Sequence, residues 1–414
     1  MALVVHLLCC LLGLGSWVTI NGVWVELPLI VPHAPEGWEL PSYVTLLTQF
    51  ANIGPLAVTL THKLWHGRLN EAPVIYLLLV VGAVACLLLT FLWHETTWVG
   101  GSRRSTALLA LIFCLALVDC TSSVTFLPYM SRFRPDYLTT YFIGEGLSGL
   151  MPALVALGQG VGVVHCVSEN GTEANRTQVN VTLTAQYQEA HFPVWGFFLF
   201  LTGMMATSLL AFITLNRMPM ERGQIEESRG VEQSSVMGEQ LARGNKRTES
   251  LKGRYTWVEG LFIFLVLGWV NALTNAALPA VQTYSCMSYG GQIYHLAVSL
   301  AAMANLLACG IAMYLPDRSL VTMGVLTVTG TGIGGYIMGV AVLSPCCAGC
   351  CSWGFSYVKV IIGVILRDEG HRALVWCGAV VQLGSMVGAL TMFPLVNVYK
   401  LFHSGDPCSN NCPT

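Results

Sequence analysis

Long apolar segments recur along this chain of 414 residues, and they constrain its fold more than any other feature. A transmembrane helix needs about 20 predominantly apolar residues to cross a hydrocarbon core of roughly 30 Å. By that measure the sequence holds eleven candidate spans, near residues 3–30, 42–61, 73–93, 106–130, 138–164, 193–215, 256–281, 292–314, 320–343, 352–366 and 373–399. Only 10% of the residues are charged, against about 25% in soluble domains. The sequence therefore predicts an all-α polytopic membrane protein.

The first span departs from the composition of a lipid-facing helix. It carries aromatic, amide and ionisable residues where lipid favours Leu and Val, namely Trp17, Asn21, Trp24, Glu26 and Pro28. A polar side chain at that depth is costly unless it faces a protein interior or a water-filled cavity. The segment is therefore predicted to line a pathway. The alternative is that Glu26 lies near the outer end of the span, where a carboxylate reaches water.

Two polar connections set the expected topology. Residues 165–192 hold three N-glycosylation sequons, which indicate a non-cytoplasmic loop, at Asn170, Asn175 and Asn180. Residues 216–255 mix eight basic residues with six glutamates and are typical of a disordered cytoplasmic linker. One span separates the two segments, so their opposite sides are consistent.

This orientation puts the N-terminus in the cytoplasm and the C-terminus outside. It places 15 of the 20 basic residues on the cytoplasmic side, in agreement with the positive-inside rule. Arg103 and Arg104, which are adjacent in a predicted outside segment, are the local exception.

A weak internal repeat suggests two halves. Trp17, Asn21 and Pro28 of the first span are echoed by Trp269, Asn271 and Pro279 of the seventh. The eleventh span similarly resembles the fifth. The repeat is either real or a chance similarity between hydrophobic helices. If real, it gives a parallel 6+5 pseudo-repeat, the arrangement of transporters that rock two bundles about a central site. The expected domains are a six-span bundle at 1–215, the linker at 216–255, a five-span bundle at 256–399 and an extracellular tail at 400–414.

Six cysteines gather in segments that this topology places outside. Four crowd one loop and two lie in the tail: Cys346, Cys347, Cys350, Cys351, Cys408 and Cys412. An oxidising environment favours one or two disulfides that tie the tail to the loop. A zinc site is the alternative, but no histidine lies within the cluster, so no metal site is predicted.

A set of polar and aromatic residues within the spans is the candidate substrate site. It consists of Trp17, Asn21, Trp24, Asn52, Thr121, Ser122, Asn271, Asn275, Asn305, Tyr357 and Gln382. Amides and hydroxyls suit a neutral ligand with carbonyls, ring nitrogens and hydroxyls, and indole rings can stack on a planar ring. The alternatives are interhelical hydrogen bonding for the amides and interfacial or core packing for the tryptophans. No enzyme motif stands in a usable context, so catalysis is not predicted.

Four ionisable residues are candidates for proton transfer or gating. Asp119 and Lys359 lie in spans of opposite halves and are a candidate gating ion pair. Glu145 is either a proton carrier or a carboxylate that nearby hydroxyls and backbone groups satisfy. Glu36, in the turn before Trp38, is either a sensor of outside pH or, as the default, a solvated turn carboxylate.

Seven stretches carry a resemblance to a known family: residues 15–28, 35–43, 119–128, 144–150, 271–286, 356–360 and 367–368. Together they resemble the vertebrate riboflavin transporter family, and within it the third, intestinal-type branch. The resemblance implies a major-facilitator variant similar to the equilibrative nucleoside transporters. It implies sodium-independent riboflavin uptake at the plasma membrane, apical in epithelia, favoured by acidic pH outside.

The resemblance also implies that riboflavin is a substrate and that no cofactor is needed. The net charge of −2 gives no indication of a nucleic-acid partner. The rival functions are a nucleoside-type carrier and a cell-surface receptor without transport. One departure from the family pattern is a shortened stretch between Pro345 and Ser356, which leaves about 15 residues, or about 22 Å of helix, for the tenth span.

Overall fold

The computed structural model describes residues 2–64, 71–130, 133, 135–160, 164–169, 182–187, 190–218, 257–287, 290–314, 319–343 and 371–404. The first half contains the helices α1 (Ala2–Leu14), α2 (Val18–Ile30), η1 (Gly37–Glu39), α3 (Leu40–Phe50), α4 (Ile53–Leu64), α5 (Glu71–Leu92), α6 (Thr106–Met130), α7 (Pro135–Gln159) and α8 (Val194–Arg217). The second half contains α10 (Trp257–Ala272), the π-helix η2 (Leu273–Ala277), α11 (Leu278–Cys286), α12 (Gly291–Tyr314), α13 (Leu320–Leu343) and α15 (His371–Asn397).

Ten of the eleven predicted spans coincide with these helices, which confirms the predicted all-α membrane fold. Within the described residues, eight helical segments are long and apolar enough to cross a membrane. The number is nine if α1 and α2, which bend by 51°, count as one broken span. The remaining prediction, 352–366, lies outside the described residues. The fifth span is shorter than predicted, because α7 ends at Gln159 and Gly160 follows with a φ of 70°.

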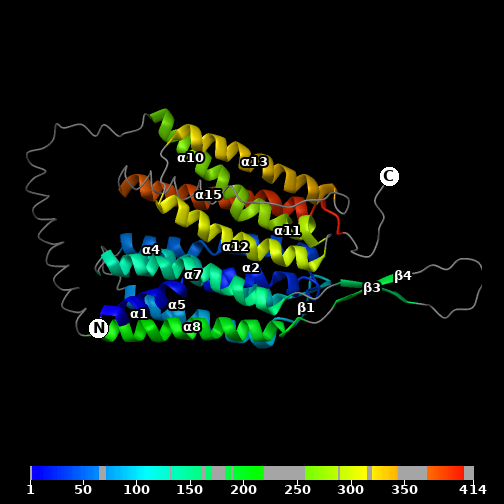
Figure 1. Ribbon diagram of the computed structural model, residues 1–414, viewed down its shortest axis with the longest axis horizontal. Coiled ribbons are helices and arrows are strands. Elements are labelled where there is room, and N and C mark those ends of the chain that lie inside the picture. Colours follow the sequence, from blue (N-terminus) through cyan, green and yellow to red (C-terminus); the bar gives the residue numbers. More distant parts are fainter. Residues whose placement is uncertain are drawn as a thin grey trace, which may run out of the picture.

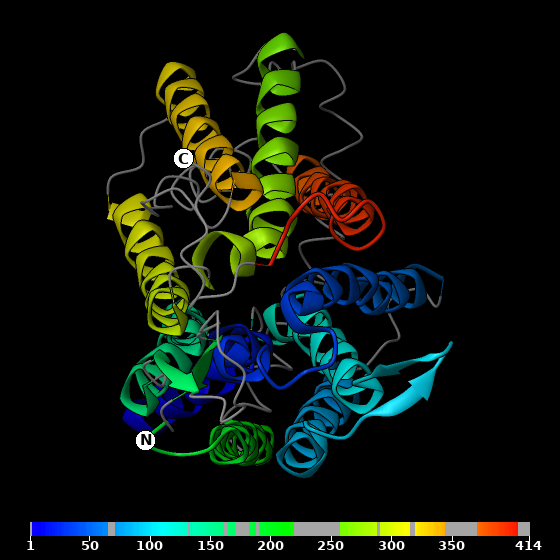
Figure 2. The ribbon, with the colours of Figure 1, turned by 90° about the vertical axis from the view of Figure 1, so that its right-hand side faces the viewer.

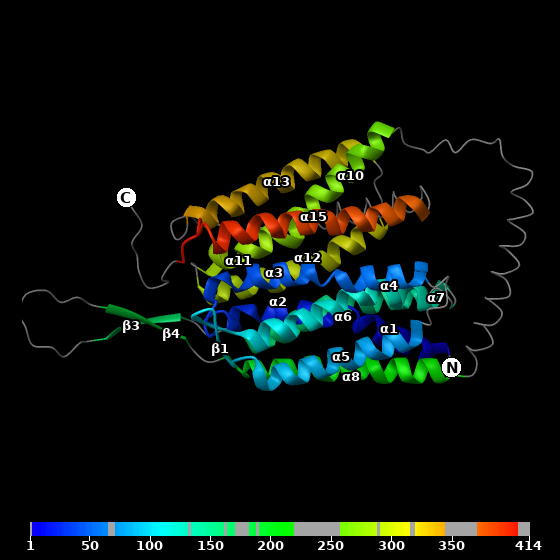
Figure 3. The ribbon, with the colours of Figure 1, turned by 180° about the vertical axis from the view of Figure 1, so that it is seen from behind.

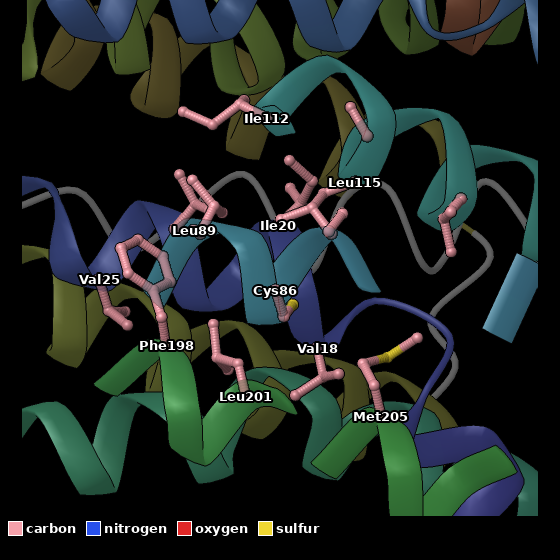
Figure 4. Close-up of a cluster of buried hydrophobic side chains, with 14 of the residues drawn as sticks. Val18, Ile20, Val25, Cys86, Leu89, Ile112, Leu115, Phe198, Leu201 and Met205 are labelled. Carbon is pink, nitrogen blue, oxygen red and sulfur yellow. The ribbon is translucent and has the colours of Figure 1, made fainter. Parts of the chain in front are cut away.

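The first half packs around one apolar core. α5 lies between α6 and α8, while α1 packs on α7 and α8. Figure 4 shows part of this core, which includes Val18 and Val25 of α2, Cys86 of α5, Ile112 of α6 and Phe198 of α8. In the second half α10 packs on α15 and α13, and α11 packs on α13. Figure 2 shows these two groups of helices as separate bundles.

The same kind of close contact recurs in each half. A Cβ added to Gly144 of α7 would overlap the carbonyl oxygen of Cys10 in α1. A Cβ added to Gly384 of α15 would likewise overlap the carbonyl oxygen of Gly268 in α10. Glycine allows two helix backbones to approach this closely within a membrane. These helices are the first and fifth spans in one half and the seventh and eleventh in the other.

Two β-hairpins extend the fold beyond the helices, and the sequence did not predict them. β1 (Thr97–Val99) pairs with β2 (Ser102–Arg104), and β3 (Val164–Glu169) pairs with β4 (Thr182–Tyr187), both antiparallel. Both hairpins lie at one end of the helices, which we call the hairpin end, and the N-terminus lies at the other (Figures 1 and 3). The asparagines of the three sequons lie between β3 and β4 in the sequence, outside the described residues. The six candidate disulfide cysteines also lie outside the described residues.

Candidate substrate site and the contacts between the two halves

The bend in the first span is held by side chains of α6. Asp119 is fully buried, and its two carboxylate oxygens accept hydrogen bonds from Thr19 Oγ1 at 2.8 Å and from the backbone N–H of Ile20 at 2.9 Å. Ser122 Oγ donates to the carbonyl of Ser16 at 2.9 Å, just before α2 begins. The first backbone N–H groups of a helix lack partners within it and attract an anion. Asp119 and Ser122 therefore fix the start of α2.

α2 carries the aromatic and amide part of the candidate site. Asn21 and Trp24 are half-buried on one face of α2, and the half-buried Trp17 directly precedes the helix, where its carbonyl accepts the backbone N–H of Asn21 at 3.2 Å. The amide of Asn21 lies beside Gly149 of α7, where an added Cβ would be 3.5 Å from Asn21 Nδ2. Asn21 thus faces α7, while Trp17 and Trp24 pack partly against the apolar core of the first half.

The second span is also interrupted, and it brings two further candidates close together. Asn52 lies in the break between α3 and α4 and donates from Nδ2 to Gln49 Oε1 at 3.3 Å. Its buried Oδ1 accepts no hydrogen bond from the described residues. Thr121 of α6 bonds its own helix at Leu117, and its hydroxyl lies against Gly54 of α4. Thr121 is therefore close to the break that holds Asn52.

The asparagines of the seventh span form a chain of hydrogen bonds at the π-helix η2. Asn275 Nδ2 donates to Asn271 Oδ1 at 3.1 Å and to Ser385 Oγ of α15 at 3.0 Å. Asn271 Nδ2 donates to the carbonyl of Leu267 at 2.8 Å. A π-turn inside an α-helix frequently marks a functional position. Gln382, also on α15, is exposed and stands apart from this chain.

The remaining candidates are placed as follows. Glu36 is buried, contrary to the expected solvated turn, because its Oε1 accepts the backbone N–H of Ser105 at 2.8 Å, just before α6 begins. Glu145 is half-buried on α7. The side chain of Asn305 and the whole of Tyr357 and Lys359 lie outside the described residues, so the Asp119–Lys359 pair stays a prediction.

The two halves contact each other at the hairpin end. The carbonyl oxygen of Trp38 accepts a hydrogen bond from Thr283 Oγ1 at 2.7 Å, and the ring of Trp38 lies 5.7 Å from that of Tyr284. Asn397 Nδ2 of α15 donates to Ser42 Oγ of α3 at 2.7 Å. α3 packs against α11 and α15, whereas α4, beyond the break, packs against α6. α10 tilts away from the first half toward the opposite end (Figures 1 and 2).

Arg104, which the sequence predicted as a local exception to the positive-inside rule, supports this contact between the halves. Its Nη1 donates to the Tyr43 hydroxyl at 3.1 Å, and its guanidinium lies 5.6 Å from the centre of that ring. Tyr43 in turn meets Phe393 of α15 edge to face at 5.1 Å. The cation therefore supports an aromatic contact that joins the halves.

A buried polar cluster where α2, α7 and α12 meet was not predicted. Glu26 Oε1 accepts a hydrogen bond from Gln159 Nε2 at 3.0 Å, and His295 of α12 lies against the same turn of α7. On the sequence alone, Glu26 is interpreted as structural. The sequence does carry a signal for His295, because an ionisable residue inside a span marks a functional position by default.

Comparison with known proteins identifies relatives over the whole chain. A family model described as "Solute carrier family 52, riboflavin transporter" matches residues 1–404. The chain is 55% identical to "Solute carrier family 52, riboflavin transporter, member 3-B" of Danio rerio and 47% identical to member 3 of Homo sapiens, with 100% of each chain covered. It is 39% identical to human member 2, covering 98% of this chain and 97% of that one.

Solved structures show the same fold at low sequence identity. A mutant of the nucleoside transporter NupG matches with a TM-score of 0.57 and 10% identity, covering 95% of this chain and 92% of that one. The xylose transporter XylE matches with a TM-score of 0.52 and 13% identity, covering 94% and 91%. At such identities the likeness shows the fold alone, and that fold is the predicted major-facilitator type.

Proposed function

The chain belongs to the solute carrier family 52 of riboflavin transporters, and on that premise we propose that it takes up riboflavin across the plasma membrane by alternating access. The observation that carries the mechanism is the closure of the two halves at the hairpin end, through α3 on one side and α11 and α15 on the other. Two bundles that meet at one end of a central site are the arrangement that rocking transporters use.

The sequons support the orientation of the protein in the membrane. If the stretch between β3 and β4 is glycosylated outside the cell, the hairpin end is the outer end, and the N-terminus is cytoplasmic. The described conformation is then closed toward the outside. Uptake requires the contacts of Trp38 and Ser42 with the second half to separate, admit substrate and form again. In this proposal the 1–215 and 256–399 bundles are the moving units.

Riboflavin offers a planar tricyclic ring with a polar edge and a ribityl chain of hydroxyls. The ring would stack on Trp17, which directly precedes α2, or on Trp24 within it, and both are half-buried. Asn21 makes no side-chain hydrogen bond with the described residues, so its amide is available to the polar edge of the ring. The hydroxyl-bearing chain would reach toward Thr121. Riboflavin is the cargo in this scheme and not a cofactor.

The test is labelled riboflavin uptake by cells that express the full chain, compared with the double variant Asn21→Ala, Trp24→Ala. Loss of one stacking contact and one hydrogen bond should weaken binding by about 1–3 kcal/mol, or roughly 5- to 150-fold. Trp98→Ala, which removes an exposed tryptophan of β1, is the matched control and should keep normal uptake. Normal uptake by the double variant at wild-type surface level would exclude this site.

The same assay separates the rival functions and tests the ionic requirements. Unlabelled flavins should compete for uptake, and nucleosides should not. Uptake should persist when sodium is replaced and should increase when the outside medium is acidified. Ligand-triggered signalling without any flux of riboflavin would instead favour a receptor.

A further inference from the structure

Four buried polar atoms have no hydrogen-bond partner among the described residues at the junction of α2, α7 and α12. They are Glu26 Oε2, Gln159 Oε1, His295 Nε2 and Ser299 Oγ. α2 and α7 belong to the first half and α12 to the second. Buried polar atoms in native proteins nearly always have partners, so a group of unpaired ones indicates a missing ligand, water or proton.

One turn of α7 holds the two ionisable members of this cluster. Gln159 Nε2 donates to Glu26 Oε1 at 3.0 Å, and His295 of α12 lies beside the backbone of Ala156 on the same turn of α7. Ala156 and Gln159 are three residues apart, so they share a face of the helix. His295 Nε2 has no partner among the described residues, so it is a vacant acceptor in the neutral tautomer that carries its proton on Nδ1. Glu26 Oε2 is also an acceptor when ionised. Two vacant proton acceptors from opposite halves thus lie against the same turn.

The cluster lies just beneath the hairpin end. Gln159 is the last residue of α7, and its Nε2 also donates to the carbonyl of Phe192 at 3.1 Å, shortly before α8 begins. The exposed His191 lies next to it and bonds the carbonyl of Gly158 at 3.1 Å through Nδ1. Gln159 thus links Glu26 to the exposed segment that precedes α8 at this end.

The other titratable groups on the neighbouring helices do not neutralise Glu26. Asp119 of α6 is committed to the start of α2, and Glu145 of α7 lies fourteen residues before Gln159, about 21 Å along the helix. α8 carries a single charged residue, Arg217, at its far end. On α12 the other titratable neighbour is the fully buried Tyr294. Glu26 is therefore a buried carboxylate whose only partner among the described residues is an amide.

We propose that Glu26, together with His295, is the proton-binding site that couples outside pH to riboflavin uptake, an inference that rests on the proposed function. Protonation converts Glu26 Oε2 from an acceptor into a donor. It can then hydrogen-bond an acceptor on α12, either His295 Nε2 or Ser299 Oγ, and so join α2 to the second half. Binding of a proton from outside favours closure of the outer end, and release to the cytoplasm allows that end to open again. No covalent bond other than the O–H bond forms or breaks.

The experiment measures labelled riboflavin uptake by proteoliposomes that contain the full chain, at an outside pH of about 6 and about 8, on either side of neutrality. Glu26→Gln mimics the protonated carboxyl, and His295→Gln removes the ring. The controls Glu95→Gln and His94→Gln change an exposed pair at the same end of the molecule, in which His94 Nε2 lies 3.5 Å from Glu95 Oε1. One coupled proton changes apparent affinity by up to about tenfold per pH unit.

We expect uptake by wild type and both controls to be greater at the lower pH, and uptake by Glu26→Gln to be equal at the two values. An active Glu26→Gln carrier with the wild-type pH ratio would overturn the proposal. If this variant takes up nothing, binding of riboflavin to the purified protein at both pH values replaces uptake. Binding with the wild-type pH dependence would then overturn the proposal, and pH-independent binding would support it.

Failure of this proposal and failure of the proposed function are distinguishable. Uptake by wild type that does not change with pH would overturn the proton site and leave riboflavin transport standing. Absence of any riboflavin uptake by wild type, with the protein correctly inserted, would overturn both.

Discussion

Replacing Asp119 by Asn tests whether a buried carboxylate holds the bend of the first span. Asp119 is fully buried and accepts hydrogen bonds from Thr19 and from the backbone of Ile20, at 2.8 and 2.9 Å. Asparagine keeps one acceptor, but its NH₂ group faces the second donor. The loss is one charge-assisted hydrogen bond, about 1.5–3 kcal/mol, and a favourable interaction with the helix N-terminus of about 0.3–1 kcal/mol. We therefore expect Asp119→Asn to destabilise the protein by about 2–4 kcal/mol.

The assay is thermal unfolding of the purified full-length protein. At about 2–4 °C per kcal/mol, the midpoint should fall by roughly 5–15 °C. Asp136→Asn is the matched control, because Asp136 lies exposed in the first turn of α7 and its replacement should shift the midpoint little. Riboflavin uptake should fall in Asp119→Asn, since α2 carries the aromatic part of the candidate site. An unfolding midpoint equal to that of the control would refute the reasoning, because a neutral side chain would then satisfy both donors.

Three further changes test the contacts within and between the halves. Gly384→Val places side-chain atoms against the backbone of α10 and should destabilise the protein by about 1–3 kcal/mol in thermal unfolding. Gly335→Val is the control and should destabilise it less, because no described atom lies within 4 Å of a Cβ added there. Arg104→Ala removes a hydrogen bond and a cation–π contact worth about 1–2 kcal/mol together. The KM for riboflavin should therefore change by up to about 30-fold, and unchanged kinetics would show that this residue does not contribute to closure. In the double variant Ser42→Cys, Asn397→Cys, oxidation should form a disulfide that holds the hairpin end closed and blocks uptake until a reductant is added. Uptake by the cross-linked protein would contradict the proposal that this end opens.

The positions of the spans could be predicted because the bilayer imposes a length and an apolar composition on each of them. The same criterion misplaced the end of the fifth span, since Gly160 stops α7 by adopting a φ of 70° within an apolar run. The length and hydropathy of a segment do not predict which distant segments it contacts. Glu36 belongs to a turn whose composition is typical of a solvated loop, and only the approach of Ser105 buries it. The pairing of Glu26 with Gln159 depends on which helices meet, which hydropathy does not encode.

Two of the interrupted spans, the first and the seventh, show why polar residues alone were an ambiguous signal for a substrate site. A helix that breaks within a membrane exposes backbone groups that the protein must satisfy internally. Asp119 serves this purpose at the break before α2, while Asn271 and Asn275 bond backbone and side chains around η2.

The polar groups of Asp119, Asn271 and Asn275 thus already make hydrogen bonds within the fold. Asn21 differs, because it lies on α2 beyond the break, half-buried beside Trp17 and Trp24, and its amide bonds no described residue. Residues that satisfy the interrupted backbone are conformational supports, and those left without a partner next to aromatic rings are the groups available to a planar ligand. By that criterion Trp17 and the face of α2 that holds Asn21 and Trp24 are the strongest part of the candidate site.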